Sequence, residues 1–191
     1  MSTTEILTAS KALSGFVKIW KTDPASGESS LVVDKPNLIL KGATKIITQA
    51  LTGDTSHAIW GMYIGYNNLA SFSLAGAPTI DSSYTTTFAA RADANFGYLR
   101  EPLSFTPNFS TSSGASQQNT VLFSTMVTSA NSVGGAVFNN SSNIYEVALI
   151  AAPAASDKLK DVVFSRTNFS PVRYDNTYNF TITWGVRILV A

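Results

Sequence analysis

His57 is the only histidine in the chain and the one side chain suited to act as a base near neutral pH. A serine hydrolase would use such a base to activate its nucleophile; Ser56 lies directly before His57, and Asp54 lies three residues before it. Adjacent residues on a strand point to opposite faces, so Ser56 and His57 would not form a dyad there. The sequence also lacks the G-x-S-x-G motif of a nucleophile elbow. These features favour a lone histidine at the start of a strand.

Paired carboxylates are a second possible source of chemistry, because a glycosidase needs two acids that converge across a cleft. The chain has no cysteine, which excludes a disulfide and a thiolate zinc site, and its single histidine excludes a multi-histidine metal site. It also lacks a calcium loop, a phosphate-binding loop and a dinucleotide-binding glycine pattern. We therefore expect no catalytic residue, no metal and no cofactor. The acidic residues are scattered singly, mostly in expected turns: Asp23, Asp34, Asp54, Asp81, Asp157 and Asp175.

Glu146 has the most unusual setting of these acids, because it stands within the apolar segment IYEVALIAA. A carboxylate on a covered strand must be protonated or paired. Arg166, Arg173 and Arg187 lie on later strands or turns and are candidate partners. A catalytic acid is the alternative, but structural ion pairs also place acids in such settings. We predict a structural ion pair, with Glu146, Arg166 and Arg187 as the candidate residues.

The tryptophans could stack on sugars or nucleobases if they were exposed. All of them lie in apolar strand patterns, so we expect packing in the core or at an interface: Trp20, Trp60 and Trp184. Glycines inside strand patterns are expected at bulges or close backbone contacts rather than at a phosphate. These glycines are Gly61, Gly65 and Gly185.

The elements that position these residues are predicted to be short strands, since aromatic and β-branched runs alternate with Gly, Pro, Asn, Asp and Ser. Residues 15–21 and 31–33 predict a hairpin. Apolar residues alternate with polar ones over 178–188, which predicts a strand with one apolar face. About eight to ten strands predict a β-sandwich, jelly-roll-like or otherwise. The other expected strands are 57–66, 84–91, 97–106, 120–128, 143–151 and 160–167.

Residues 42–51 predict one short helix, because Ile46, Ile47, Ala50 and Leu51 fall on one face. Gly53 suits the left-handed position that ends a helix. We expect this helix to close an open end of the sandwich. Long loops are expected at 67–83, 108–119 and 130–143. The chain is divided into an N-terminal arm, residues 1–14, and a single β-sandwich domain, residues 15–191.

The composition of the chain argues against two kinds of binding partner, nucleic acids and membranes. Charged residues make up 13 % of the chain and its net charge is +1, which argues against nucleic-acid binding. No segment approaches the roughly 18–20 apolar residues that span a bilayer. The first residues, MSTTEILTASKALSG, lack the basic start and long apolar core of a secretory signal. We expect no nucleic acid, no membrane partner and assembly in a reducing cytoplasm.

Two segments carry a family resemblance: NLILKGATKIITQALTGDTSHAIWGMYIGYNN, residues 37–68, and IYEVALIAAPAASDKLKDVVFSRTNFSPVRYDNTYNFTITWGVRILVA, residues 144–191. Together they resemble β-rich virion structural proteins of tailed bacteriophages. Those proteins have an N-L-I-x-x-G-like entry to a helix, an I-G-x-G-type strand, an F-S-R-x-x-F-like hairpin and a final T-I-T-W strand. Residues 69–135 show no matching pattern. The resemblance implies a shell or tail component, present in many copies and without enzymatic chemistry.

The first functional hypothesis is a capsid decoration, or cement, protein that binds the major capsid protein as a homo-oligomer, with a trimer favoured. The arm would act as the clamp, with Ile6, Leu7 and Leu13 as interface candidates. The alternative is a tail, baseplate or fibre-attachment component. Both hypotheses place the protein in the virion. A carbohydrate-binding module would instead need exposed aromatic residues on one face, and a hydrolase would need two converging acids.

Overall fold

The computed structural model describes residues 13–54, 58–70, 95–103, 108–112, 117–128, 132–133, 136–152 and 161–190. Within these residues the chain forms two antiparallel sheets and the helix α2 (Lys41–Leu51). The five-stranded sheet has the order β2 (Ser29–Pro36), β1 (Leu13–Thr22), β11 (Asn179–Val190), β7 (Gln117–Met126) and β6 (Asn108–Ser112). The six-stranded sheet has the order β3 (Leu38–Ile39), β10 (Val162–Arg173), β9 (Asn143–Ala152), β4 (Ala58–Asn67), β5 (Phe96–Pro102) and β8 (Ser132–Val133).

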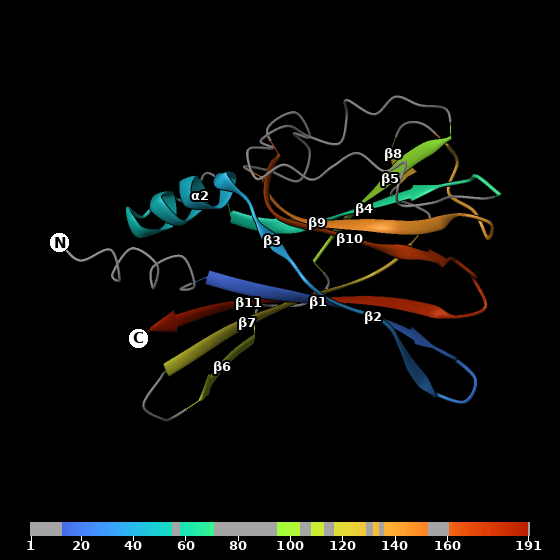
Figure 1. Ribbon diagram of the computed structural model, residues 1–191, viewed down its shortest axis with the longest axis horizontal. Helices are drawn as coiled ribbons and strands as arrows, with labels where there is room; N and C mark the ends of the chain where they lie inside the picture. The colour runs from blue at the N-terminus through green and yellow to red at the C-terminus, as the bar shows by residue number, and fades with distance from the viewer. Residues whose placement is uncertain are drawn as a thin grey trace.

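The two sheets lie face to face, with the main hydrophobic core between them (Figure 1). This arrangement confirms the predicted all-β class and the β-sandwich. The strand order alone does not establish a jelly roll, so that finer description stays a prediction. Strands adjacent in sequence form hairpins in both sheets, for example β1 with β2 and β9 with β10.

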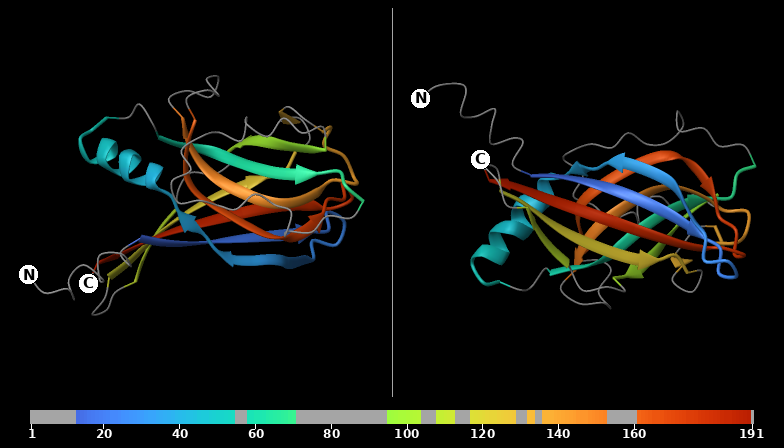
Figure 2. Two further views of the ribbon diagram at one scale, coloured as in Figure 1. Left: turned by 45° about the horizontal axis from the view of Figure 1, so that its top comes forward. Right: turned by 90° about the horizontal axis from the view of Figure 1, so that it is seen from below.

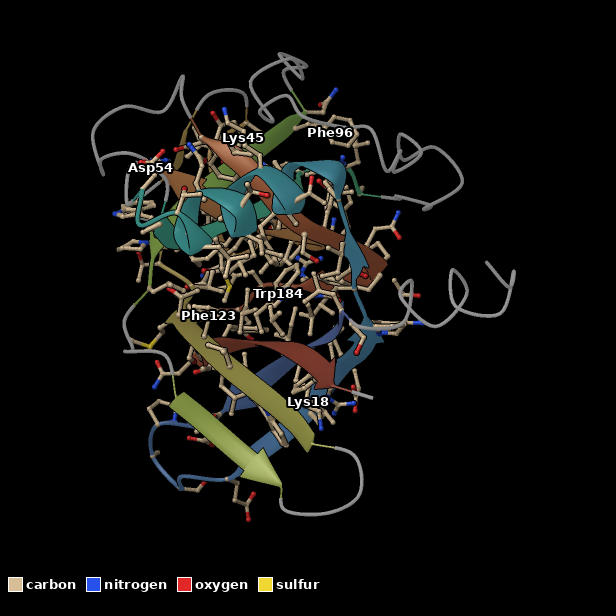
Figure 3. The ribbon with its side chains drawn as sticks, turned by 90° about the vertical axis from the view of Figure 1, so that its left-hand side faces the viewer. Lys18, Lys45, Asp54, Phe96, Phe123 and Trp184 are labelled. Carbon is tan, nitrogen blue, oxygen red and sulfur yellow. The ribbon has the colours of Figure 1, made fainter. Side chains whose placement is uncertain are left out.

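Strand β11 shows why the apolar residues of this sequence form a sandwich. Thr181 and Thr183 point away from the core and are partly exposed. Trp184 and Phe123, on the neighbouring strand β7, lie between the two sheets (Figure 3). The predicted period of two is therefore confirmed for the middle of this strand. The alternating residues buried in the core are Phe180, Ile182, Trp184 and Val186.

The β1–β2 hairpin, also predicted, is closed by a turn around Asp23. The Asp23 carboxylate accepts a hydrogen bond from the Ala25 N–H at 2.7 Å, and Gly27 adopts a φ of 75°, which favours glycine. The register between the strands shifts between Ile19 and Trp20, where Val32 of β2 is the extra residue. This bulge keeps Leu31 opposite Trp20 on the outer face.

Helix α2 lies at one end of the sandwich (Figures 1 and 3) and ends at a left-handed glycine, Gly53, with a φ of 76°. Its Ala43 and Ile46 are buried in the main core. Leu51, expected on the buried face, is instead 84 % exposed. The helix starts close to β10, since a side chain at Gly42 would meet the Val163 carbonyl. The first half of α2 therefore packs on the sandwich and its last turn points into solvent.

Several predicted boundaries differ from the structure. The loop expected at 108–119 contains β6 and the start of β7, and the loop at 130–143 contains the short strand β8. Polar Ser, Thr and Asn dominate both segments, and a pattern without apolar alternation gives no strand signal. Strand β1 begins at Leu13, two residues before the expected domain boundary. Residues 1–12 and the strand expected at 84–91 lie outside the described residues.

The three glycines in strand patterns mark irregularities or close contacts, as expected. The pairing of β4 with β9 shifts register between Ile59 and Gly61 and again between Gly65 and Tyr66. On β11, a side chain at Gly185 would meet the ring of Phe16.

Candidate functional site

The outer face of the six-stranded sheet, which points away from the main core, is also buried. Leu40, Tyr63, Ile150 and Val163 form a second hydrophobic cluster on it. Strand pairing places four outward residues side by side across β10, β9, β4 and β5: Arg166, Ala148, Tyr63 and Arg100. Two arginines therefore lie on a covered face, where each needs an anionic partner.

Arg166 is the partner of Glu146, with Nη2 donating to Oε2 at 2.5 Å, and both side chains are buried. Glu146 lies opposite Asn168, while Arg166 lies opposite Ala148, so the ion pair runs diagonally between β9 and β10. The structure thus joins two of the three residues that the sequence proposed for a structural ion pair.

The other arginines considered as partners of Glu146 lie elsewhere. Arg187 is on the five-stranded sheet, where its guanidinium lies 4.8 Å from the centre of the Phe16 ring. Arg173 is exposed and donates to Ser141 at 3.3 Å. Arg187 is therefore ruled out as part of this ion pair, because the two sheets separate it from Glu146.

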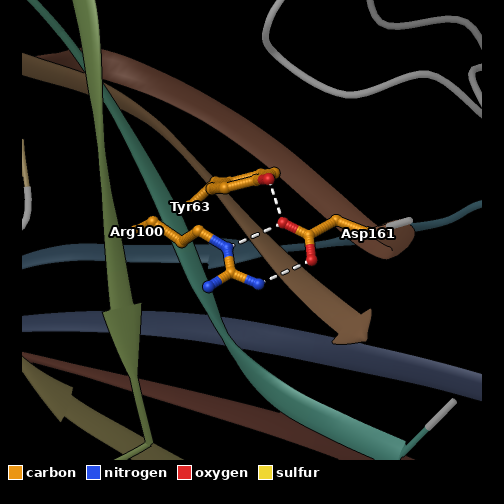
Figure 4. Close-up of polar contacts among 3 residues, drawn as sticks. All are labelled: Tyr63, Arg100 and Asp161. Atoms are coloured by element: carbon orange, nitrogen blue, oxygen red, sulfur yellow. Dashed lines mark hydrogen bonds and ion pairs between the residues drawn. The ribbon is translucent and has the colours of Figure 1, made fainter. Parts of the chain in front are cut away.

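A second buried ion pair joins Arg100 of β5 to Asp161, the residue before β10 (Figure 4). Arg100 Nε donates to Asp161 Oδ2 at 2.8 Å, and Nη2 donates to Oδ1 at 2.7 Å. The Tyr63 hydroxyl donates to the same Oδ2. The Arg100 guanidinium lies 3.9 Å from the centre of the Trp60 ring, and the Tyr98 ring meets Tyr63 edge-on at 5.0 Å. We call Arg100, Asp161 and Tyr63 the carboxylate clamp.

Two members of the carboxylate clamp, Tyr63 and Arg100, have raised pKa values. Burial, followed by the hydrogen bond to Asp161, raises the pKa of Tyr63 far above its ordinary value of 10.0. The hydrogen bond to Asp161 raises the pKa of Arg100, and burial raises the pKa of Tyr98. Tyr63 and Arg100 therefore keep their protons through the physiological range, whereas general acid–base catalysis needs a pKa near the working pH. This geometry suits a clamp between strands.

The sequence analysis missed the carboxylate clamp. The alternation along β5 contained a clue. Tyr98 and Arg100 are two residues apart and lie on the outer face of the sheet, while Leu99 between them points into the core. A charged residue at such a position on a covered strand demands a partner, as Glu146 does. The partner could not be chosen, since Asp161 reaches Arg100 only through the order β10-β9-β4-β5.

A buried carboxylate also links the two sheets. Glu101, which follows Arg100 and points inward, accepts hydrogen bonds from the Thr128 N–H at 2.8 Å and the Thr128 hydroxyl at 3.0 Å. Thr125 of β7 donates to the Pro102 carbonyl at 2.7 Å. These bonds connect β5 of one sheet to the end of β7 in the other.

Of the residues considered for a serine hydrolase, the structure describes only Asp54. Ser56 and His57 lie outside the described residues, and Asp54 accepts a hydrogen bond from Gln49 Nε2 at 2.9 Å at the end of α2. The described residues contain no group of three or more His, Cys, Asp or Glu side chains that could hold a metal ion. Of the interface candidates, Leu13 lies in β1 and packs against the main core, while Ile6 and Leu7 lie outside the described residues.

The outer face of the five-stranded sheet is open to solvent, in contrast to that of the six-stranded sheet. Strand pairing places Leu31, Trp20, Thr181 and Met126 in one row across β2, β1, β11 and β7. Leu31 is 41 % exposed and Met126 is 46 % exposed. Helix α2 does not cross this face, which is turned toward the viewer in the right panel of Figure 2. We call this surface the open face.

A second apolar row on the open face contains Phe16, Gly185 and Leu122. The Phe16 ring lies over Gly185, and the Lys18 ammonium lies 5.8 Å from the centre of that ring. Between the two rows, Lys18 forms an exposed ion pair with Asp34 at 3.5 Å. The open face therefore combines partly exposed apolar side chains with the Lys18–Asp34 pair and the exposed Arg187, whose guanidinium lies over the Phe16 ring.

No family model, curated protein or solved structure matches this chain. Among the described residues, no helix is both long and apolar enough to cross a bilayer.

Proposed function

We propose that this protein is a non-enzymatic structural protein of a tailed-bacteriophage virion, and that it acts as a capsid decoration protein. In this role it binds the major capsid protein and stabilises the head. The observation that carries the proposal is the open face, whose partly exposed Leu31, Trp20 and Met126 suit contact with another protein. The class of protein comes from the resemblance of residues 37–68 and 144–191 to such virion proteins.

The distribution of charge supports a structural role. Two arginines are held in buried ion pairs, Arg166 with Glu146 and Arg100 with Asp161, and both pairs tie strands of the six-stranded sheet together. The chain carries a net charge of +1, so many copies can sit side by side with little mutual repulsion. A sandwich fastened in this way resists deformation on a particle surface.

In the proposed attachment, residues 1–12 act as the clamp on the particle. Ile6 and Leu7 supply apolar anchors, and the segment adds to a capsid protein as a strand or short helix. Attachment of this kind depends on apolar area more than on charge. Salt in the physiological range screens exposed charges beyond about 8–10 Å, so raising it should weaken attachment only slightly.

Co-sedimentation with undecorated heads tests the proposal. Full-length protein should sediment with heads at saturating copy number, and a variant lacking residues 1–12 should bind more weakly while its melting temperature stays the same. Purified tails serve as the competing particle. Binding to tails but not to heads would assign the protein to the tail, baseplate or fibre-attachment class instead. Binding to neither particle would overturn the virion role.

A further inference from the structure

The outward charges of the open face do not cancel. The charged residues in the outward rows that strand pairing defines are Lys18, Asp34 and Arg187. Lys18 and Asp34 form the exposed pair at 3.5 Å. Arg187 is also exposed, and it forms no ion pair with a carboxylate of the described residues. The open face therefore carries an uncompensated positive charge, and charge complementarity favours an acidic partner.

The Phe16 ring holds Arg187 in position. The guanidinium carbon of Arg187 lies 4.8 Å from the centre of this ring, and the ring extends over β11 at Gly185, where a side chain would meet it. A guanidinium that stacks on an aromatic ring keeps the N–H groups of its edge available for bidentate binding of a carboxylate. Because the contact with the ring already restricts the side chain, binding costs less conformational entropy than it would for a freely rotating lysine. Arg187 is therefore pre-organised to receive a planar anion.

Arg187 lies at the end of the open face where residues 1–12 join the sandwich. It is opposite Ser14 of β1, and β1 begins at Leu13, directly after those residues. In the proposed function residues 1–12 bind the major capsid protein, so the bound capsid protein is held next to Arg187. Thr120 of β7 lies on the other side of Arg187 in the same row. The hydroxyls of Ser14 and Thr120 can donate further hydrogen bonds to an acid at this position.

The row next to Arg187 is apolar and adds a second requirement. It contains Phe16, Gly185 and Leu122, two residues further along strands β1, β11 and β7. Two residues of a strand span about 6.6 Å, and a partner strand that lies in the same direction presents its facing side chains at the same interval. The open face therefore fits an extended segment in which an acidic residue and an apolar residue are two positions apart.

We propose that Arg187 binds an Asp or Glu carboxylate of the major capsid protein, within a segment of this acidic and apolar pattern. The inference rests on the proposed function and names the chemical group that the open face selects in its partner. Arg187 is then a specificity-determining residue, because a neutral capsid surface would leave its guanidinium buried without a counter-ion. One ion pair enclosed in an apolar contact is screened little by salt, which agrees with the weak salt dependence expected for attachment.

The affinity for undecorated heads, measured by co-sedimentation over a range of head concentrations, tests this inference. Arg187→Gln should raise the dissociation constant about 10- to 100-fold, because the carboxylate of the partner loses its counter-ion. Arg187→Lys should recover only part of the loss, since an ammonium lacks the planar fork. Lys45→Gln is the matched control and should bind as wild-type protein does. It removes the same charge from an exposed site on α2, away from Lys18 and the open face (Figure 3). Thermal melting should change little in all three variants, as both positions are exposed.

Blocking the acids of the head gives a second readout. Treatment with a carbodiimide and glycinamide converts exposed carboxylates of undecorated heads to neutral amides. Wild-type protein should bind these amidated heads more weakly than untreated heads. Arg187→Gln should then bind the amidated heads as tightly as wild-type protein does, because the two changes remove the same contact.

The outcomes separate the inference from the proposed function. If wild-type protein binds heads and Arg187→Gln binds them equally well, the inference is wrong and the proposed function stands. If the difference between the two proteins persists in full on amidated heads, Arg187 contacts a group other than a carboxylate, which also overturns the inference. Wild-type protein that does not bind heads would contradict the proposed function, and the inference would fall with it.

Discussion

Arg100 and Asp161 lie 61 residues apart in the sequence and form a two-point ion pair, with Nε–Oδ2 and Nη2–Oδ1 distances of 2.8 Å and 2.7 Å. In the sheet order β10-β9-β4-β5, this pair links the start of β10 to β5 across two intervening strands. Tyr63 of β4 completes the arrangement by donating to the same carboxylate. A buried pair that reaches across the four central strands of the six-stranded sheet makes the position of β10 depend on that of β5.

Replacing Asp161 with Asn should lower the free energy of unfolding by about 3–5 kcal/mol, because it leaves the Arg100 guanidinium buried without its counter-ion. The measurement is urea unfolding followed by circular dichroism. Asp34→Asn is the matched control, since it breaks the exposed pair with Lys18 and should cost less than about 1 kcal/mol. Equal decreases in the free energy of unfolding of the two variants would mean that the buried pair contributes no more to stability than the exposed pair.

Tyr63 should make stability fall at alkaline pH. Its pKa is raised in the folded protein, mainly by burial, while the unfolded chain ionises near 10.0. Above that pH the native state holds a proton that the unfolded state has lost, so the contribution is complete below pH 10.0 and is lost as the pH rises. Urea unfolding from pH 8 to pH 11 should show a steeper decline for wild-type protein than for Tyr63→Phe.

At neutral pH the same Tyr63→Phe variant should be less stable than wild-type protein by about 1.5–3 kcal/mol, since a buried carboxylate loses a hydrogen-bond donor. Parallel stability curves for the two proteins across the alkaline range would contradict the shifted ionisation of Tyr63.

The middle of β11 could be predicted from the sequence because its signal is local. Phe180, Ile182 and Trp184 alternate with threonines, and a period of two assigns every side chain to a face without knowledge of the neighbouring strands. The buried pairing of Glu146 was predictable for a similar reason, because an acid in an apolar strand must have a partner wherever the strand lies.

The other features of the candidate site depend on the order of the strands in each sheet, which cannot be read from local sequence patterns. The carboxylate clamp and the open face both exist because particular strands are neighbours, for example β11 beside both β1 and β7. Strand β6 escaped prediction because its sequence, NFSTS, has too little apolar alternation to signal a strand. Strand β6 forms because its backbone pairs with β7, and this pairing cannot be recognised from the five residues of β6 alone.

Trp184→Ala should lower the free energy of unfolding by about 3–5 kcal/mol, because the side chain is fully buried between the sheets and its removal leaves a cavity. Leu51→Ala removes a side chain that is 84 % exposed and should change stability by less than about 0.5 kcal/mol. Thermal and urea unfolding of the three proteins measure the difference. A Trp184→Ala variant as stable as Leu51→Ala would show that the two sheets do not pack around this residue.

Gly61 on β4 and Gly185 on β11 allow a comparison of two close contacts that differ in what the added methyl group meets. At Gly61 it would meet the backbone carbonyl of Glu101 on β5, whereas at Gly185 it would meet the ring of Phe16. Backbone in the middle of a sheet cannot move without disturbing the ladder, so Gly61→Ala should cost about 1–3 kcal/mol. The Phe16 ring can rotate toward solvent, so Gly185→Ala should cost only about 0.5–1.5 kcal/mol.

The decisive measurement is a double-mutant cycle with Phe16→Ala. Once the ring is removed, nothing from it opposes a methyl group at Gly185, so Gly185→Ala should change the stability of that variant by less than about 0.5 kcal/mol. The cost of Gly61→Ala should be unchanged by Phe16→Ala, because the carbonyl of Glu101 remains in place. Suppose instead that Phe16→Ala reduced the cost of both glycine substitutions equally. The effect would then be a general one on stability, and not a contact between the Phe16 ring and residue 185. Relief at Gly185 alone would show that contact with Phe16 is the reason why β11 has a glycine on its outer face.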